Sequence, residues 1–163
     1  MFVVTTVYPA SADNRRAIVR IVASEMVRIA GSMARRHDDD VIEYMVFTAI
    51  WVLNSEHLIG DERYAALKSI PPNVMRRPVT LGDLRREIPM PEPILTTYVD
   101  RLLKKGFVEQ APGGLIAPTA VFTEPDMLEG ADELYGRMMQ MAASMRNAGF
   151  SFGDDQTHPK EPS

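Results

Sequence analysis

The segment 79–122 constrains the fold of this chain most strongly, because it combines a helix, a proline break, a second helix, a glycine and a hairpin. Thr80 can cap the first, short helix. The sequence Pro89-Met90-Pro91 ends that helix, since proline lacks an amide donor and clashes with the preceding turn. Apolar residues at helical spacing predict the second helix from Glu92 to Lys105, and Gly106 supplies its left-handed stop.

A tight hairpin is predicted behind the second helix. Residues 107–110 and 115–117 can form its strands, and Ala111-Pro112-Gly113-Gly114 between them is a turn sequence. Two short helices that meet through a tight turn and precede a hairpin can place one helix in the major groove of DNA. The segment therefore predicts a helix-turn-helix with a short β-wing.

The end of the second helix resembles a known family. The resemblance is carried by Tyr98-Val99-Asp100-Arg101-Leu102-Leu103-Lys104-Lys105-Gly106-Phe107-Val108-Glu109. These residues are similar to the recognition helix and first wing strand of MarR-type winged-helix regulators, and a looser resemblance extends over 79–122. The resemblance implies a mainly α-helical fold with a small β-hairpin wing, in which long N- and C-terminal helices flank a winged helix-turn-helix.

The same resemblance implies a transcriptional regulator that binds specific duplex DNA as a homodimer. It places Thr96 and Thr97 at the exposed front of the recognition helix, where threonine can contact base edges. Arg85 and Arg86 on the preceding helix suit the phosphate backbone. The expected DNA contacts are Arg76, Arg77, Arg85, Arg86, Glu92, Thr96, Thr97, Tyr98, Arg101, Lys104 and Lys105.

Two features depart from the family pattern. Glu92 is an acid where the family often has a basic residue, and the hairpin tip lacks the arginine that such regulators commonly send into the minor groove. These departures favour an alternative function, a winged helix that serves as a protein–protein interaction module and no longer binds DNA.

The charge of the chain is unevenly distributed. Net charge is −4, yet residues 76–105 contain seven basic side chains against four acidic ones. Salt screens charges more than about 10 Å away, so local charge governs contact with phosphate. The basic cluster therefore favours DNA as a partner despite the acidic total.

Long helices are predicted on both sides of this segment, one from 14 to 36 and another from Glu124-Pro125-Asp126 to Gly149. Each has an apolar seam that advances by alternating three and four residues, as in helices that pack at shallow angles. The resemblance implies that these helices form the homodimer, and packing within one chain is the alternative. The expected interface residues are Val19, Val22, Met26, Ile29, Met127, Leu134, Met138, Met141 and Met145.

Residues 41–58 are nearly all apolar and predict a central helix that is buried on all sides, with Trp51 as its largest contribution to the core. Asp40 and Glu43 form a pattern like a capping box at the start of this helix. A further short helix is predicted over 61–69.

The predicted organisation is an extended segment at 1–10, one domain at 11–150 and a polar, disordered tail at 151–163. Cysteine is absent, and no apolar run reaches the roughly 18 residues of a membrane span. The first residues lack the pattern of a signal peptide. We therefore expect a cytoplasmic protein without a membrane partner.

Other chemistry is weakly indicated by the sequence. His37-Asp38-Asp39-Asp40 contains metal-ligand types, but consecutive loop residues rarely converge on one ion, so no metal site is predicted. Phosphate-binding, nucleophile and zinc motifs are lacking, so neither a cofactor nor an enzyme activity is expected. A soft methionine surface could accept a small apolar ligand, although ordinary packing is the favoured interpretation. That surface comprises Tyr135, Met138, Met139, Met141 and Met145.

Overall fold

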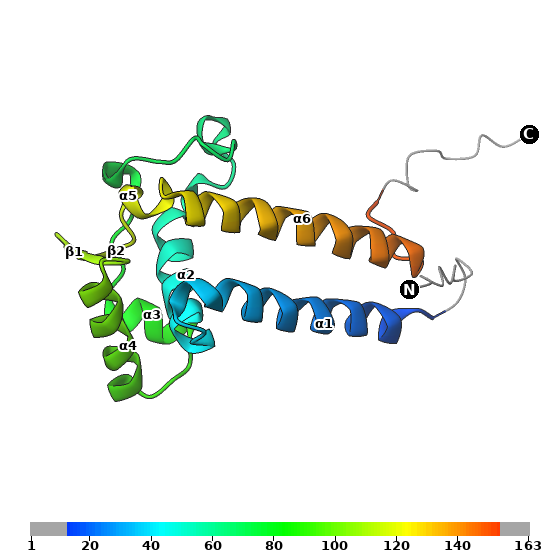
Figure 1. Ribbon diagram of the computed structural model, residues 1–163, viewed down its shortest axis with the longest axis horizontal. Helices are drawn as coiled ribbons and strands as arrows, with labels where there is room; N and C mark the ends of the chain where they lie inside the picture. The colour runs from blue at the N-terminus through cyan, green and yellow to red at the C-terminus, as the bar shows by residue number, and fades with distance from the viewer. Residues whose placement is uncertain (1–12, 154–163) are drawn as a thin grey trace, which may run out of the picture. The chain divides into compact units, whose positions relative to one another are not determined.

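The computed structural model describes residues 13–153, which are mainly helical with one small antiparallel sheet (Figure 1). The predicted fold class is confirmed at that level. The chain divides into two compact units, a larger one of residues 30–133 and a smaller one formed by the described parts of 1–29 and 134–163. The predicted extended segment at the N-terminus and most of the predicted tail lie outside the described residues. Within the described part, no helix has the length and apolar character needed to cross a membrane.

The larger unit packs around α2, which spans Val41–Ser55. Asp40 caps this helix by accepting hydrogen bonds from the amides of Ile42 and Glu43. The core around α2 also draws on the elements that follow it in the chain. Its buried residues are Val46, Phe47, Ala49, Ile50, Val79, Leu84, Leu95, Val99, Leu102, Val108, Leu115, Ala117 and Val121.

The predicted burial of α2 on all sides is wrong. Trp51 is 36% exposed, and its ring packs against Phe122 at a centroid distance of 5.7 Å. Val41, Ile42 and Met45 are exposed as well. The core is filled instead by Phe47 and by aliphatic side chains from several elements, and the exposed residues of α2 lie outside it.

α3 and α4 match the predicted pair of helices closely. α3 spans Leu81–Glu87 and begins with a reciprocal capping box, in which Thr80 and Asp83 each accept a hydrogen bond from the other's backbone amide. α4 spans Glu92–Lys105 and ends at Gly106, whose φ of 79° is a left-handed conformation that glycine adopts without strain.

Two short strands, β1 at Glu109–Ala111 and β2 at Gly114–Ile116, form the predicted hairpin. β2 also pairs on its other side with Val79, which exchanges two backbone hydrogen bonds with Leu115 at 2.9 and 2.8 Å. Gly114 is required at this crossing, because a Cβ atom there would lie 2.4 Å from the carbonyl oxygen of Val79. The hairpin is thereby tied to the residues that precede α3.

The link between α2 and α3 contains single turns of 3-10 helix rather than the helix predicted over 61–69. Asp61 caps one of these turns, because its carboxylate accepts a hydrogen bond from the backbone amide of Arg63. Leu67, further along the predicted helix, is exposed and does not pack on the core. A short helix without such packing is unstable in water. A further short helix, α5, was not predicted. The elements concerned are η2 Glu56–Leu58, η3 Glu62–Tyr64, η4 Asn73–Met75 and α5 Thr119–Phe122.

Two long helices, α1 at Arg15–Ala34 and α6 at Pro125–Asn147, contribute residues to both units. A 3-10 turn, η1 at Arg35–His37, continues α1. Within the smaller unit α1 and α6 run antiparallel, because the start of α1 contacts the end of α6. The joining contacts are Asn14 Nδ2 to the carbonyl oxygen of Ala148 at 3.0 Å and Arg137 Nη1 to Glu25 Oε1 at 3.3 Å.

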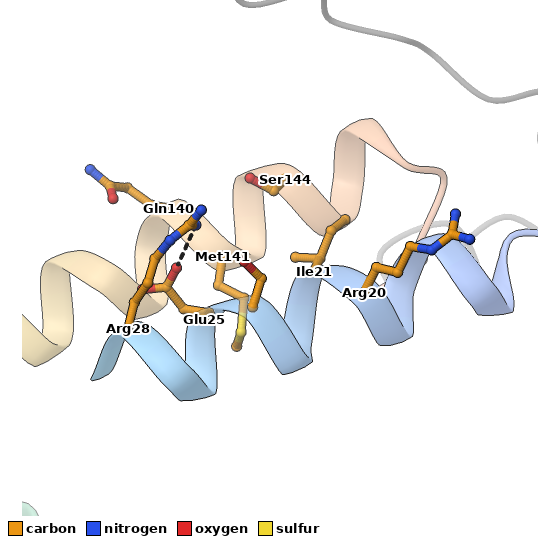
Figure 2. Close-up of a pocket in the computed structure, with 8 residues that line it drawn as sticks. Arg20, Ile21, Glu25, Arg28, Gln140, Met141 and Ser144 are labelled. Carbon is orange, nitrogen blue, oxygen red and sulfur yellow. Dashed lines mark ion pairs between the residues drawn. The ribbon is translucent and has the colours of Figure 1, made fainter. Parts of the chain in front are cut away.

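An open hollow of about 320 Å³ lies between α1 and α6 in the smaller unit (Figure 2). Met141 and Ile21 line it together with charged and polar side chains, among them Arg28, which pairs with Glu25. The methionines of α6 do not share one environment, since Met145 is buried and its neighbours are half-buried or exposed. A ligand for the predicted methionine surface remains a prediction.

Candidate nucleic-acid interface

α4 turns one face to the core of the larger unit and the opposite face to solvent. The buried face consists of Leu95, Val99 and Leu102. At 100° per residue, Thr97 and Lys104 lie on the far side of the helix, and both are exposed. Thr96 is exposed beside them, next to a surface hollow that α4 forms with the hairpin. The exposed side of α4 that carries Thr96 and Thr97, called the threonine edge below, is therefore accessible to a large partner.

The hydroxyl of Thr97 is already engaged within α4. It donates a hydrogen bond to the carbonyl oxygen of Pro93 at 2.9 Å. A hydroxyl has a single donor, so Thr97 offers solvent its methyl group and its acceptor lone pairs. Such a surface suits a thymine methyl group or the exocyclic amine of cytosine or adenine.

Tyr98 and Arg101 point toward the start of α2, where both donate hydrogen bonds to Asp40 Oδ2, at 3.2 and 2.8 Å. The Arg101 guanidinium also lies 4.7 Å from the centre of the Tyr98 ring. Burial acts to raise the pKa of Asp40, but hydrogen bonds from the Glu43 amide and from Arg101 outweigh it and lower that pKa. These two side chains were predicted to contact DNA, and in the structure they bind α4 to α2.

Lys105 is engaged in the same way by Glu43, which is 0% exposed. Its ammonium lies 2.9 and 3.0 Å from the two carboxylate oxygens of Glu43 and 2.6 Å from Asp38 Oδ2. The hydrogen bonds to Asp38 and Glu43 raise the pKa of Lys105. Glu43 thus turns inward instead of completing the predicted capping box, and Lys105 neutralises its buried charge.

His37 also contacts Glu43, and the sequence did not indicate this structural role. It is 2% exposed, with Nδ1 3.0 Å from Glu43 Oε1 and the rings of Phe47 and Phe107 beside it at centroid distances of 5.2 and 4.7 Å. Burial lowers the pKa of His37 more than the bond to Glu43 raises it. Among residues 13–153, no group of three or more His, Asp or Glu side chains is arranged to hold a metal ion.

Arg85 and Arg86 of α3 are exposed but paired. Arg85 Nη1 lies 2.8 Å from Glu92 Oε2, with the two side chains 50% and 55% exposed. Arg86 pairs with Asp83 within the same helix. Exposed pairs of this kind contribute about 0–1 kcal/mol, so a phosphate can replace the carboxylate at low cost.

The prediction that Arg76 contacts DNA is contradicted by its burial. Its side chain is 5% exposed, with Nη2 3.2 Å from the carbonyl oxygen of Pro71 and the guanidinium 4.8 Å from the centre of the Phe122 ring. Burial lowers the pKa of Arg76. The neighbouring Arg77 is exposed, so the two arginines differ in burial although they are adjacent in sequence.

Asn54 is a second residue that the sequence did not indicate. It is 0% exposed, and its amide donates to the carbonyl oxygens of Arg77 at 2.6 Å and Leu115 at 3.0 Å. Its side-chain oxygen accepts from the amide of Ala117 at 2.8 Å. Asn54 thus fixes the hairpin to α2, and an asparagine in a mostly apolar helix was its signal in the sequence.

Comparisons with known proteins give no further guide, because the chain matches no protein-family model, no curated protein and no solved structure.

Proposed function

We propose that this protein binds duplex DNA as a homodimer and regulates transcription, with α4 as the recognition helix and the β1–β2 hairpin as the wing of a MarR-type winged helix. The observation that carries the proposal is the exposed threonine edge of a helix that is held firmly against α2 and followed by a hairpin. In the major groove, Thr96 and Thr97 would face base edges.

The basic side chains divide into two groups in this proposal. Arg85, Arg86, Arg77 and Lys104 are exposed and would contact the phosphate backbone. Tyr98, Arg101 and Lys105 would orient the recognition helix by binding the start of α2, and would contribute little to phosphate contact.

An apolar surface on the smaller unit supports the homodimer. At 100° per residue, Val19 and Met26 lie on the flank of α1 away from the residues that line the hollow, and they are 65% and 64% exposed. On the matching flank of α6, Tyr135 is 66% exposed and Met138 is half-buried. Exposed apolar residues gathered on one side of a helix pair are typical of an interface. A second copy of the chain would cover them.

A second candidate function is supported by the charges around α4. Glu92 and Asp100 are exposed acids on this helix, and the hairpin has no basic residue at its tip. A winged helix of this kind could bind a basic protein surface instead of DNA.

A salt titration with random-sequence duplex DNA separates the two functions. For a DNA binder, affinity should fall steeply with salt, with a slope of about −0.9 per phosphate contact in a log–log plot. Absence of binding at low salt would favour the protein–protein function. Arg85→Ala with Arg86→Ala should weaken binding to all sequences, whereas Thr97→Ala should change sequence preference. Equal effects of these variants on every sequence would contradict the assigned roles.

A further inference from the structure

Two kinds of ion pair hold the basic side chains around α4. On the α2 side, Lys105 binds Glu43, whose carboxylate is fully buried. On the α3 side, Arg85 binds Glu92 in the first turn of α4, and about half of each side chain is exposed. The two pairs differ in how readily the cation can exchange its partner.

Lys105 cannot leave Glu43 without abandoning a buried charge, which strongly destabilises a protein. Arg85 can leave Glu92 easily, because solvent replaces the lost contact on both sides. Glu92 is also stabilised by its place at the N-terminus of α4, where the helix dipole favours a negative charge whether or not Arg85 is bound. Arg85 is therefore the cation that an incoming phosphate can take.

We propose that Glu92 is an internal competitor for phosphate, which occupies Arg85 and limits binding to duplex DNA that lacks the preferred sequence. The inference rests on the proposed function. A phosphate that approaches Arg85 must displace Glu92 from it. Base contacts by the exposed Thr96 and Thr97 compensate for this cost on the preferred sequence only.

The test compares Glu92→Gln with Glu87→Gln in the full-length protein. Glu87 is an exposed acid on α3 that forms no ion pair among residues 13–153, so its replacement changes net charge equally without freeing Arg85. Binding of a random-sequence duplex is followed by fluorescence anisotropy over a range of salt concentrations. Glu92→Gln should bind roughly two- to fivefold more tightly than Glu87→Gln, and its salt slope should be steeper by about 0.9, as for one additional phosphate contact.

The same pair of substitutions in an Arg85→Ala background completes the design. There the advantage of Glu92→Gln over Glu87→Gln should disappear, because no arginine remains to be freed. The inference alone is overturned if the wild-type protein binds DNA but the two variants bind equally, if Glu92→Gln binds more weakly, or if its advantage survives without Arg85. If neither the wild-type protein nor any variant binds duplex DNA at low salt, the proposed function and this inference both fail.

Discussion

Two carboxylates at the start of α2, those of Asp40 and the fully buried Glu43, determine which cations of α4 are available to a ligand. Lys105 Nζ and His37 Nδ1 lie 2.9 and 3.0 Å from Oε1 of Glu43, and Arg101 Nη1 lies 2.8 Å from Asp40 Oδ2. Removing one partner of a buried ion pair costs about 3–5 kcal/mol, whereas an exposed pair contributes about 0–1 kcal/mol. The positions of Asp40 and Glu43 therefore separate the cations that hold α4 in place from those that a ligand can reach.

His37 should make the stability of the protein depend on pH. Its pKa in the folded state is lowered by burial, so below the ordinary histidine pKa of about 6.5 the unfolded chain takes up a proton that the folded chain does not. The free energy of unfolding should therefore decrease as pH falls from about 6.5, by up to about 1.4 kcal/mol per pH unit until the folded-state pKa is reached. Of its charged neighbours, Lys105 has a raised pKa and Asp38 a lowered one, so neither titrates in this range.

Urea unfolding at about pH 7.5 and about pH 5.5 measures this dependence. His37→Gln keeps a polar group near Glu43 but cannot be protonated, and it should lose most of the difference between the two conditions. A variant whose stability still falls as steeply as that of the wild-type protein would assign the dependence to another group.

At the level of the elements, the β1–β2 hairpin is held in place by other parts of the chain as well as by the pairing of its two strands. β2 pairs with β1 on one side and with Val79 on the other, and Asn54 of α2 binds the carbonyl oxygen of Leu115. A two-stranded hairpin alone is marginally stable in water. The three attachments allow strands this short to persist beside α4.

Gly114→Ala should destabilise the protein by about 2–4 kcal/mol, because its φ of 147° disfavours a side chain and the new Cβ would meet the backbone of Val79. Gly136→Ala is the matched control. Gly136 lies exposed within α6, and an added methyl group there would meet no atom within 4 Å beyond its chain neighbours and the backbone of its own helix, so alanine should stabilise the helix by up to about 1 kcal/mol. Chemical denaturation measures both changes. A Gly114→Ala variant that is as stable as the wild-type protein would contradict the close approach of β2 to the backbone of Val79.

For the whole molecule, the exposed apolar residues of the smaller unit decide the expected assembly. Val19 and Met26 of α1 and Tyr135 of α6 remain exposed in a single chain, although residues of this type are usually buried. A homodimer would remove them from water, and each Å² of apolar surface buried contributes roughly 25 cal/mol.

Met26→Asp should convert the proposed homodimer into a monomer, because a carboxylate would be buried without a partner in the interface. Ser24→Asp is the control, since Ser24 is exposed on α1, lines the hollow of Figure 2 and lies about 160° around the helix from Met26. Size-exclusion chromatography with light scattering measures the mass of each variant. Dissociation by both substitutions, or by neither, would argue against this surface as the interface.

The sequence by itself determined the local features of the fold. The bounds of α4, the cap at Thr80, the stop at Gly106 and the hairpin behind it all follow from hydrogen bonding and steric effects among residues near one another in the chain. These signals are local, so they can be recognised without knowing the rest of the fold.

Only the tertiary structure decided which side chains are buried and which cations are available. Arg101 binds Asp40, which lies 61 residues earlier in the chain, and Lys105 binds Glu43, which lies 62 residues earlier. No local sequence pattern identifies partners so far apart. For the same reason Trp51 was expected in the core and Arg76 at the surface, whereas the structure exposes part of the first and buries the second. Burial and charge pairing depend on what the folded chain brings from elsewhere, and helical spacing carries no information about that.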